Sequence, residues 1–189
     1  MSDPFEDFYD EIDNLDSAVS KFIHTHEFGE RWDGTWAYFA FSYERAFEQL
    51  ARKAYEDGSR GMHLIEPLFF LARHSIELAL KATIAEFAQI DATAPQLVGH
   101  KLLDLWDQLY AVMDRYGSPP NDDWGLKCRG LVAHIHEVDP EGDRYRYPSN
   151  RKGIEFAGTS IDVAGLIRAH GHVTTYLDAC RSMYSAGYR

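Results

Sequence analysis

Apolar residues recur at three- and four-residue intervals along most of the chain, which is the spacing of one face of an α-helix. The pattern predicts six helices, over residues 5–27, 35–57, 65–88, 100–116, 122–137 and 159–185. Glycine and proline separate these segments, most clearly at Gly117-Ser118-Pro119-Pro120. The helix over 65–88 is apolar around more than half of its circumference, so we expect it to be the central, most buried helix.

The segment between the last two predicted helices, residues 139–158, is expected to be a long loop or a small β-hairpin. Its turn residues include Pro140 and Pro148, and Ile154-Glu155-Phe156 has the composition of a short strand. Asn121 is expected to cap the helix over 122–137, and Thr159 or Ser160 the last helix.

These patterns predict an all-α fold, an up-and-down bundle of about six helices. The length of 189 residues fits a single domain over 1–189. Within it, residues 1–60 would form a helical extension packed on a bundle over residues 62–185.

Composition places the chain among globular proteins. Apolar residues make up 45% of it and charged residues 26%. No run of about 18 uncharged apolar residues occurs, and the first residues lack the basic start and apolar run of a signal peptide. The two cysteines, Cys128 and Cys180, form neither a disulfide framework nor a CxxC metal knuckle. We therefore expect a cytoplasmic protein that does not associate with membranes.

Charge argues against a protein that coats nucleic acid. Lysine and arginine number 19 against 30 aspartate and glutamate, a net charge of −11. Residues 1–16 hold seven carboxylates and no cation, whereas residues 127–152 hold six cations and four carboxylates. A local site for an anion is therefore expected in the second region.

Arg73, Glu77 and Lys81 follow one another at four-residue steps on the predicted helix over 65–88. This spacing forms two i,i+4 ion pairs, each worth a few tenths of a kcal/mol. The simplest interpretation is a solvated stripe of salt bridges.

Arg129 is followed by His134 and His136, a pairing that suits RNA cleavage without metal. A histidine can accept the 2′-hydroxyl proton near neutral pH, and an arginine can stabilise charge on the phosphate. On a helix, His134 lies about 140° around from Arg129, and His136 about 20° away and two turns on. The alternative is that Arg129 pairs with a carboxylate and that both histidines are structural.

Arginine and tyrosine alternate in the predicted loop within Asp143-Arg144-Tyr145-Arg146-Tyr147-Pro148. Such a segment can present guanidinium groups and stacking faces to a nucleotide. Alternatively, the tyrosines plug the end of the bundle and the arginines pair with aspartate and glutamate.

Metal binding is not expected. Three His-x-His pairs occur, at 24 and 26, 134 and 136, and 170 and 172. Residues two apart on a helix point about 200° apart, so such a pair cannot share a metal. No glycine-rich phosphate loop or serine nucleophile elbow is present. The sequence therefore predicts neither a metal nor a cofactor.

Four motifs, taken in order, resemble those of the HEPN family of helical domains over about residues 62–185. The family's His-x-x-x-Glu-x-x-x-Lys-Ala helix is matched by His74, Glu77, Lys81 and Ala82, with the first spacing one residue shorter. Its His-x-Leu-x-x-Leu segment is matched by His100, Leu102 and Leu105. Its Arg-x(4–6)-His motif is matched by Arg129 with His134 or His136, and its Arg-Tyr-Pro segment by Arg146-Tyr147-Pro148.

The resemblance implies a bundle that often forms a homodimer. In many members two Arg-x(4–6)-His motifs meet across the dimer in a metal-independent ribonuclease site, and these members act as toxins or in phage defence. Arg129 would then stabilise the phosphate and His134 would be the base, with His136 as the second candidate. A cognate antitoxin would be a partner.

Other members of the family bind nucleotides or partner proteins without catalysis. Gly130 favours this alternative, because active members usually carry Asn, Asp or His directly after the arginine. The expected ligand is RNA or a nucleotide. The candidate residues for binding the nucleotide or its phosphate are Arg144, Arg146, Tyr147, His100 and Lys81.

Overall fold

The computed structural model describes residues 22–23, 34–90, 92–95, 97–115 and 122–185. These residues form α2 (Trp36–Asp57), the 3-10 helix η2 (Gly58–Leu64), α3 (Ile65–Ile90), α4 (Leu102–Arg115), α5 (Asp123–Val138) and α6 (Val163–Ser185). No strand occurs in the described ranges, which confirms the all-α class. The chain divides into two compact units, residues 1–31 and 32–189. All the helices described here belong to the second unit.

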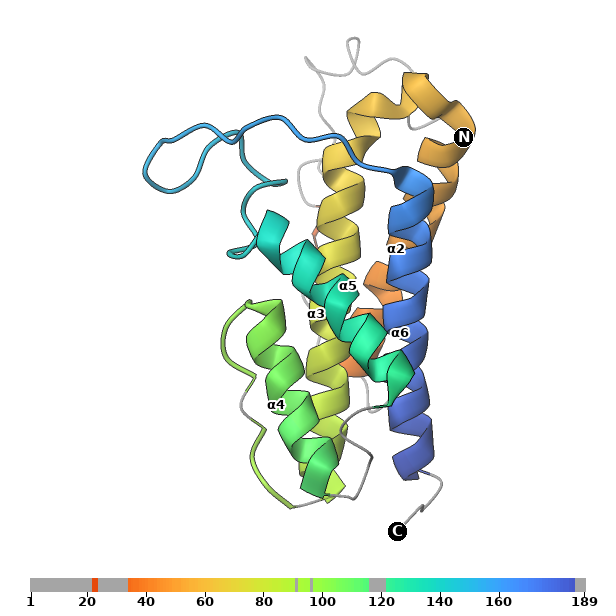
Figure 1. The fold of residues 1–189 in the computed structure, drawn as a ribbon, viewed down its shortest axis with the longest axis vertical. Coiled ribbons are helices and arrows are strands. Elements are labelled where there is room, and N and C mark those ends of the chain that lie inside the picture. The colour runs from red at the N-terminus through yellow and green to blue at the C-terminus, as the bar shows by residue number, and fades with distance from the viewer. Residues whose placement is uncertain (1–21, 24–33, 91, 96, 116–121, 186–189) are drawn as a thin grey trace. The chain divides into compact units, whose positions relative to one another are not determined.

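The helix α3 is the centre of this unit, as its composition predicts. It packs against α2, α4 and α6 (Figure 1). Its buried residues occur on every side, because the run of apolar residues leaves no wide polar face. Leu68, Ile76 and Leu80 on α3 are completely buried. A side chain that α3 carries is therefore held by its neighbours, whether it is apolar or polar.

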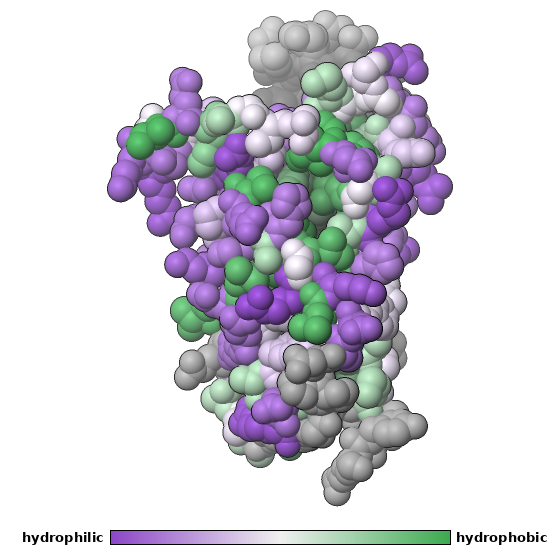
Figure 2. Space-filling model, in the orientation of Figure 1, coloured by the Kyte–Doolittle hydropathy of each residue, from purple (hydrophilic) through white to green (hydrophobic). Residues whose placement is uncertain are grey.

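The helix α5 lies against α4 and α6, and aromatic contacts join these helices. Trp106 on α4 stacks on Tyr176 of α6 with ring centres 5.7 Å apart. The Tyr176 hydroxyl donates to Asp122, just before α5. On the face drawn in Figure 2, apolar and polar residues are mixed. Among the described residues, no helix is both long and apolar enough to cross a membrane.

Two helix starts differ from the sequence prediction. The cap of α5 is Asp122, whose Oδ1 accepts from the Gly125 amide at 2.6 Å. Asn121, the predicted cap, lies outside the described residues. The helix α6 begins at Val163, so Thr159 and Ser160 are not its caps. The Thr159 hydroxyl instead forms a hydrogen bond with the Tyr145 hydroxyl, at 2.7 Å. At the start of α5 and in the segment before α6, neighbouring polar residues have similar capping strength, and tertiary contacts favour one of them over the others.

The segment between α5 and α6 is the predicted long loop. Its only β-pairing is a single antiparallel bridge, between Ser149 and Glu155. Asp139 anchors its start, since one carboxylate oxygen accepts from the amides of Asp143 and Arg144. The predicted helix over 5–27 falls outside the described residues except for Phe22 and Ile23, which are not helical.

Candidate functional site

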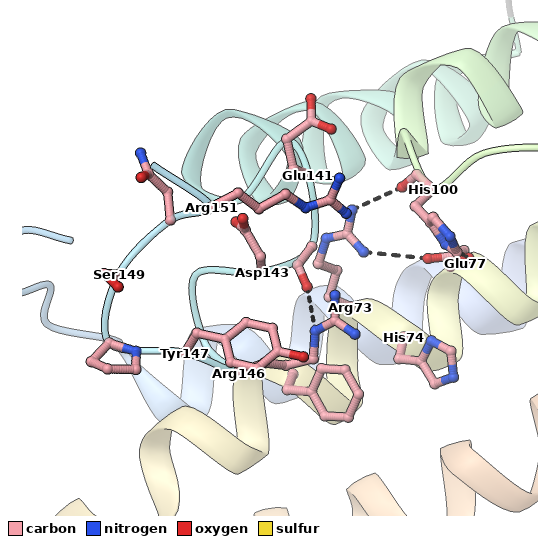
Figure 3. A pocket seen from close by; sticks show the side chains of 14 residues that line it. Arg73, His74, Glu77, His100, Glu141, Asp143, Arg146, Tyr147, Ser149 and Arg151 are labelled. Carbon is pink, nitrogen blue, oxygen red and sulfur yellow. Dashed lines mark hydrogen bonds and ion pairs between the residues drawn. The ribbon is translucent and has the colours of Figure 1, made fainter. Parts of the chain in front are cut away.

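A cavity of about 760 Å³ opens where α3, the start of α4 and the loop after α5 meet (Figure 3). Phe70, Arg73, His74 and Glu77 line it from α3, and His100 lines it from the residues before α4. The rest of the lining is the loop from Glu141 to Arg151. The cavity therefore combines a rigid helix with an irregular segment more than sixty residues further along the chain.

A buried set of charges on α3 lies at the cavity, and two of its three members, Arg73 and Glu77, line it. The exposed fractions of Arg73, Glu77 and Lys81 are only 4%, 2% and 5%. Arg73 Nη1 lies 3.3 Å from Glu77 Oε2, and Lys81 Nζ lies 2.9 Å from Glu77 Oε1. The predicted i,i+4 pairs are thus confirmed, but the predicted solvated stripe is wrong. Other parts of the protein pack around α3 at these positions, so its charged side chains are buried rather than exposed to solvent.

Arg73 joins three segments of the chain. Its Nε donates to the carbonyl oxygen of Asp139 at the end of α5, at 3.0 Å, and its Nη2 donates to the carbonyl oxygen of His100 at 2.8 Å. Gly142 packs directly on the guanidinium, since a Cβ at this position would lie 2.6 Å from Arg73 Nη1. The φ of Gly142 is +75°, which also favours glycine. Arg73 is therefore a structural support of the cavity.

Glu77 is kept ionised inside the protein. Burial raises the pKa of Glu77, but hydrogen bonds from Lys81 and His100 lower it more, so that the net shift is downward. The Lys81 ammonium also lies 5.4 Å from the ring centre of Trp36 on α2. Lys81 does not line the cavity. Lys81, one of the residues predicted to bind phosphate, thus pairs with Glu77 in this structure.

His100 connects this buried set to solvent. Its Nδ1 lies 2.8 Å from Glu77 Oε1, while 69% of its side chain is exposed. A neutral imidazole that donates Nδ1–H to the carboxylate carries its lone pair on Nε2. No hydrogen bond to Nε2 is present among the described residues. The arrangement can therefore accept a proton from a bound molecule.

His74 is a weak base in this environment. Its ring stacks on Phe70, with centres 5.5 Å apart, and meets the edge of Tyr43 at 4.5 Å. Burial lowers the pKa of His74, and the surrounding cations Arg73, Lys81 and Arg146 lower it further against the opposing effect of Glu77. His74 is thus neutral near pH 7.

Arg146 and Tyr147 form the opposite wall of the cavity. Arg146 Nε donates to the Gly142 carbonyl oxygen at 2.7 Å, and its guanidinium lies 5.7 Å from the Phe70 ring centre and 5.5 Å from that of Tyr147. Tyr147 is 57% exposed. Within the part of the chain that the structure describes, neither Arg146 nor Arg151 forms an ion pair. Both guanidinium groups are available to an anion.

Arg144 and Tyr145 lie on the other side of this wall. The Arg144 guanidinium donates to the Ala157 carbonyl oxygen and lies over the Phe156 ring, beside a second cavity of about 510 Å³. The Tyr145 ring packs at a tilt against Phe69 of α3, with ring centres 4.1 Å apart. Tyr145 therefore fits the alternative interpretation, in which a tyrosine plugs the bundle, and Arg144 is not part of the main cavity.

The lining of the main cavity is mixed in charge rather than basic. Its carboxylates are Glu77, Glu141 and Asp143, and its arginines are Arg73, Arg146 and Arg151. Glu77 is paired with Lys81 and Arg73, and Arg73 also lies 3.5 Å from a carboxylate oxygen of Asp139. Arg146, Arg151 and Asp143 remain to meet a ligand, together with Glu141, whose carboxylate lies 3.9 Å from Lys101 Nζ. A ligand that carries both an anionic group and hydrogen-bond donors matches this set.

The predicted catalytic residues lie away from this cavity. Arg129 forms an ion pair with Asp107 of α4, at 2.9 Å from Nη2 and 3.2 Å from Nε. His134 is exposed, and His136 is half-buried with a buried Nδ1 that has no hydrogen-bond partner. In the single chain, Arg129 therefore pairs with a carboxylate, as the alternative interpretation expected. The predicted nuclease site requires a second copy and stays a prediction.

The sequence did not identify five residues of the cavity as candidate binding residues, namely His74, Glu141, Gly142, Asp143 and Arg151. Of these, His74 and Asp143 had been noted only as parts of motifs. The ladder of Arg73, Glu77 and Lys81 was predicted to be a surface feature. Polar residues at four-residue steps on an otherwise apolar helix could instead have indicated a buried polar cluster. Among the described residues, no group of three or more His, Cys, Asp or Glu could hold a metal ion.

Comparison with protein-family models, with curated proteins and with solved structures finds no match for this chain.

Proposed function

We propose that the protein binds a nucleotide or a segment of RNA in the cavity between α3 and the loop at 141–151. The observation that carries this proposal is the pair of arginines, Arg146 and Arg151, without an ion pair beside the exposed ring of Tyr147. The planar guanidinium of arginine can bind two oxygens of a phosphate group at once.

Each part of the lining suits one part of a nucleotide. Arg146 is held at Nε by Gly142 and leaves both Nη groups for phosphate oxygens. Tyr147 offers a face on which a base can stack, an interaction worth about 1–3 kcal/mol per base. Asp143 and Glu141 can accept hydrogen bonds from ribose hydroxyl or base amino groups. A bare phosphate ion or an acidic peptide would leave these carboxylates opposed to its own charge.

The resemblance to HEPN proteins supports the same ligand class. In the family, the Arg-Tyr-Pro segment and the helix carrying His, Glu and Lys belong to one domain, and here Arg146-Tyr147-Pro148 and Glu77 line one cavity. The finer expectations of this resemblance are part of the proposal. They are a HEPN-like bundle, a homodimer, and a role with a cognate antitoxin or another partner protein.

Calorimetry of the full chain with ATP, GTP and a random-sequence RNA pool tests the proposal. We expect heat of binding with at least one of them, and an affinity at least about tenfold weaker for Arg146→Gln, the loss of one charge-assisted hydrogen-bonding group. The matched control is Arg168→Gln, since Arg168 is an exposed arginine of α6 outside the cavity. Absence of binding to all three ligands, or equal binding by the Arg146 variant, would contradict the proposal.

A further inference from the structure

Asp143 stands out among the carboxylates of the cavity because its side chain has no partner. It lines the cavity and is half-buried. Within the described residues, no hydrogen bond or ion pair involves its carboxylate, whereas Glu77 is paired with Lys81 and Glu141 lies 3.9 Å from Lys101. A carboxylate accepts hydrogen bonds at two oxygens, and burial makes unmet hydrogen bonds costly. A ligand that brings donors to Asp143 therefore completes the site.

The turn that carries Asp143 also carries Tyr147. The carbonyl oxygen of Asp143 accepts from the amide of Tyr147 at 3.1 Å, which closes one helical turn. In such a turn, side chains four residues apart lie on the same face, with Cβ atoms about 5–6 Å apart. Both side chains line the cavity (Figure 3). A flat ring that covers Tyr147 can therefore place one edge at the Asp143 carboxylate.

This turn is held in place by α3. Asp139 Oδ1 accepts from the amides of Asp143 and Arg144 at 3.0 and 3.2 Å. The buried Arg73 in turn donates to the carbonyl oxygen of Asp139 at 3.0 Å. Because these contacts fix the turn in the protein without a ligand, binding does not have to order it first. The acceptor and the stacking ring are thus preorganised.

We propose that the ligand of this cavity carries a guanine base, which lies on the Tyr147 ring and donates to both oxygens of the Asp143 carboxylate. This inference rests on the proposed function, since it names the base of the nucleotide whose phosphate Arg146 and Arg151 hold. It concerns recognition only and includes no chemical step.

Guanine is the base whose hydrogen-bonding edge matches a carboxylate. Its N1–H and its 2-amino group are two donors side by side, so each reaches one carboxylate oxygen. Adenine and cytosine each have an amino donor beside a ring nitrogen that accepts, and the lone pair of that nitrogen would face the second carboxylate oxygen. Uracil offers one donor between two carbonyl oxygens. The Asp143 carboxylate therefore attracts guanine and repels part of the edge of the other bases.

Calorimetry of the full chain with GTP, inosine triphosphate and ATP tests the inference. Inosine triphosphate lacks the 2-amino group but keeps N1–H, so it offers one of the two donors. We expect GTP to bind at least about tenfold more tightly than ATP, as a bidentate pair usually discriminates. The affinity for inosine triphosphate should lie between the two.

Asp143→Asn changes the recognition while keeping the shape of the side chain. An asparagine amide has one acceptor and one donor, which match xanthine, because xanthine carries an oxygen in place of the 2-amino group. The variant should bind GTP at least about tenfold more weakly than the wild type, and xanthosine triphosphate more tightly than the wild type does. Damage to the fold would not produce this gain. The matched control is Asp114→Asn, which changes an exposed aspartate of α4 outside the cavity and should leave both affinities unchanged.

The guanine can belong to a free nucleotide or to single-stranded RNA, and a second measurement distinguishes the two sources. Fluorescence anisotropy compares labelled uridine pentamers that carry guanosine or adenosine at the centre. A preference for the guanosine pentamer that Asp143→Asn abolishes supports the inference for RNA, and a preference for GTP alone supports it for a free nucleotide.

Two results would overturn the inference and leave the proposed function intact. One is binding without any preference for guanine, among either the nucleotides or the pentamers. The other is an equal loss of affinity for GTP and ATP in Asp143→Asn, which would indicate a contact with the ribose that both share. Failure of all nucleotides and RNA to bind would overturn the proposed function as well.

Discussion

Glu77 receives hydrogen bonds or ion pairs from three side chains while almost none of its own surface touches solvent. A buried carboxylate in this position is tolerated only because Arg73, Lys81 and His100 surround it. Removing the carboxylate would leave two cations close together in a medium of low polarity, which is worse than having no charges there at all.

Glu77→Gln should therefore lower the free energy of unfolding by about 3–5 kcal/mol, the range for breaking a buried ion pair from one side. Urea denaturation followed by circular dichroism measures the change. The control is Glu48→Gln, which breaks an exposed pair with Arg45 and should change stability by less than about 1 kcal/mol. A Glu77 variant as stable as the control would show that the buried cations find other partners.

His170 is a second buried polar group, on α6 and away from the cavity. The Ser75 hydroxyl donates to the Ala72 carbonyl oxygen, so it accepts from His170 Nε2, at 2.7 Å. The ring also packs on Phe47 at 3.9 Å. Burial lowers the pKa of His170 to about 4. The folded protein thus holds the neutral imidazole, which is compatible with an apolar environment.

The stability of the protein should fall as the pH falls from about 6.5 to about 4 because of His170. The unfolded chain binds a proton near pH 6.5 and the folded chain only near pH 4, so acid favours unfolding over that interval. The difference of about 2.5 pKa units corresponds to about 3 kcal/mol. Urea denaturation at a series of pH values should show this dependence in the wild type. It should be largely absent in His170→Gln, and equal slopes for the two proteins would contradict the assignment.

At the scale of elements, the loop after α5 and the helix α3 depend on each other. The loop crosses Arg73 at Gly142, the only residue type that fits the space above the guanidinium and the positive φ. Gly142 therefore allows the loop conformation that positions Arg146 in the cavity wall. Arg146 Nε donates to the carbonyl oxygen of Gly142 and is held by it.

Gly142→Ala and Gly130→Ala should have opposite effects. The first places a Cβ against Arg73 and should lower the free energy of unfolding by about 1–3 kcal/mol, together with the affinity for any ligand of the cavity. The second adds a methyl group to open space on α5 and should raise stability by about 0.5–1 kcal/mol, since alanine favours helix over glycine. Thermal unfolding of both variants measures the contrast, and the same sign for both would contradict it.

Hydrophobic periodicity predicts the helices well and their contacts poorly. The predicted ranges 35–57, 65–88 and 122–137 match α2, α3 and α5 to within about two residues, the usual precision of helix ends. The caps were missed because Asp122 and Asn121 are both good caps, and the bond from Tyr176 to Asp122 is a tertiary contact. The burial of Arg73 and Lys81 depends on what packs around α3, and a local pattern does not contain that information.

At the scale of the whole molecule, a net charge of −11 opposes the approach of nucleic acid. Any binding in the cavity must come from the few guanidinium groups there rather than from a general basic surface. The cavity itself joins segments that are far apart in the sequence. The predicted set already contained Arg146, Tyr147 and His100, whereas Glu77 was not in it, because its place in the cavity depends on how the loop crosses α3.

RNA binding should consequently depend only weakly on salt. Two phosphate contacts, at Arg146 and Arg151, correspond to a slope of about −1.4 for the logarithm of the association constant against that of the salt concentration. Fluorescence anisotropy with a labelled single-stranded RNA pool at several salt concentrations measures this slope. A much steeper dependence would indicate that the RNA follows a longer basic path elsewhere on the protein.

The buried charged residues of α3, Arg73, Glu77 and Lys81, have a consequence for laboratory evolution. Leucine or methionine in place of Arg73, Glu77 and Lys81 together would avoid the desolvation of three charges, and such exchanges often make proteins more resistant to heat. The same exchange would remove the contacts that hold His100 and support Gly142. A library of variants screened only for resistance to heat would therefore select thermostable proteins that have lost the contacts supporting this cavity.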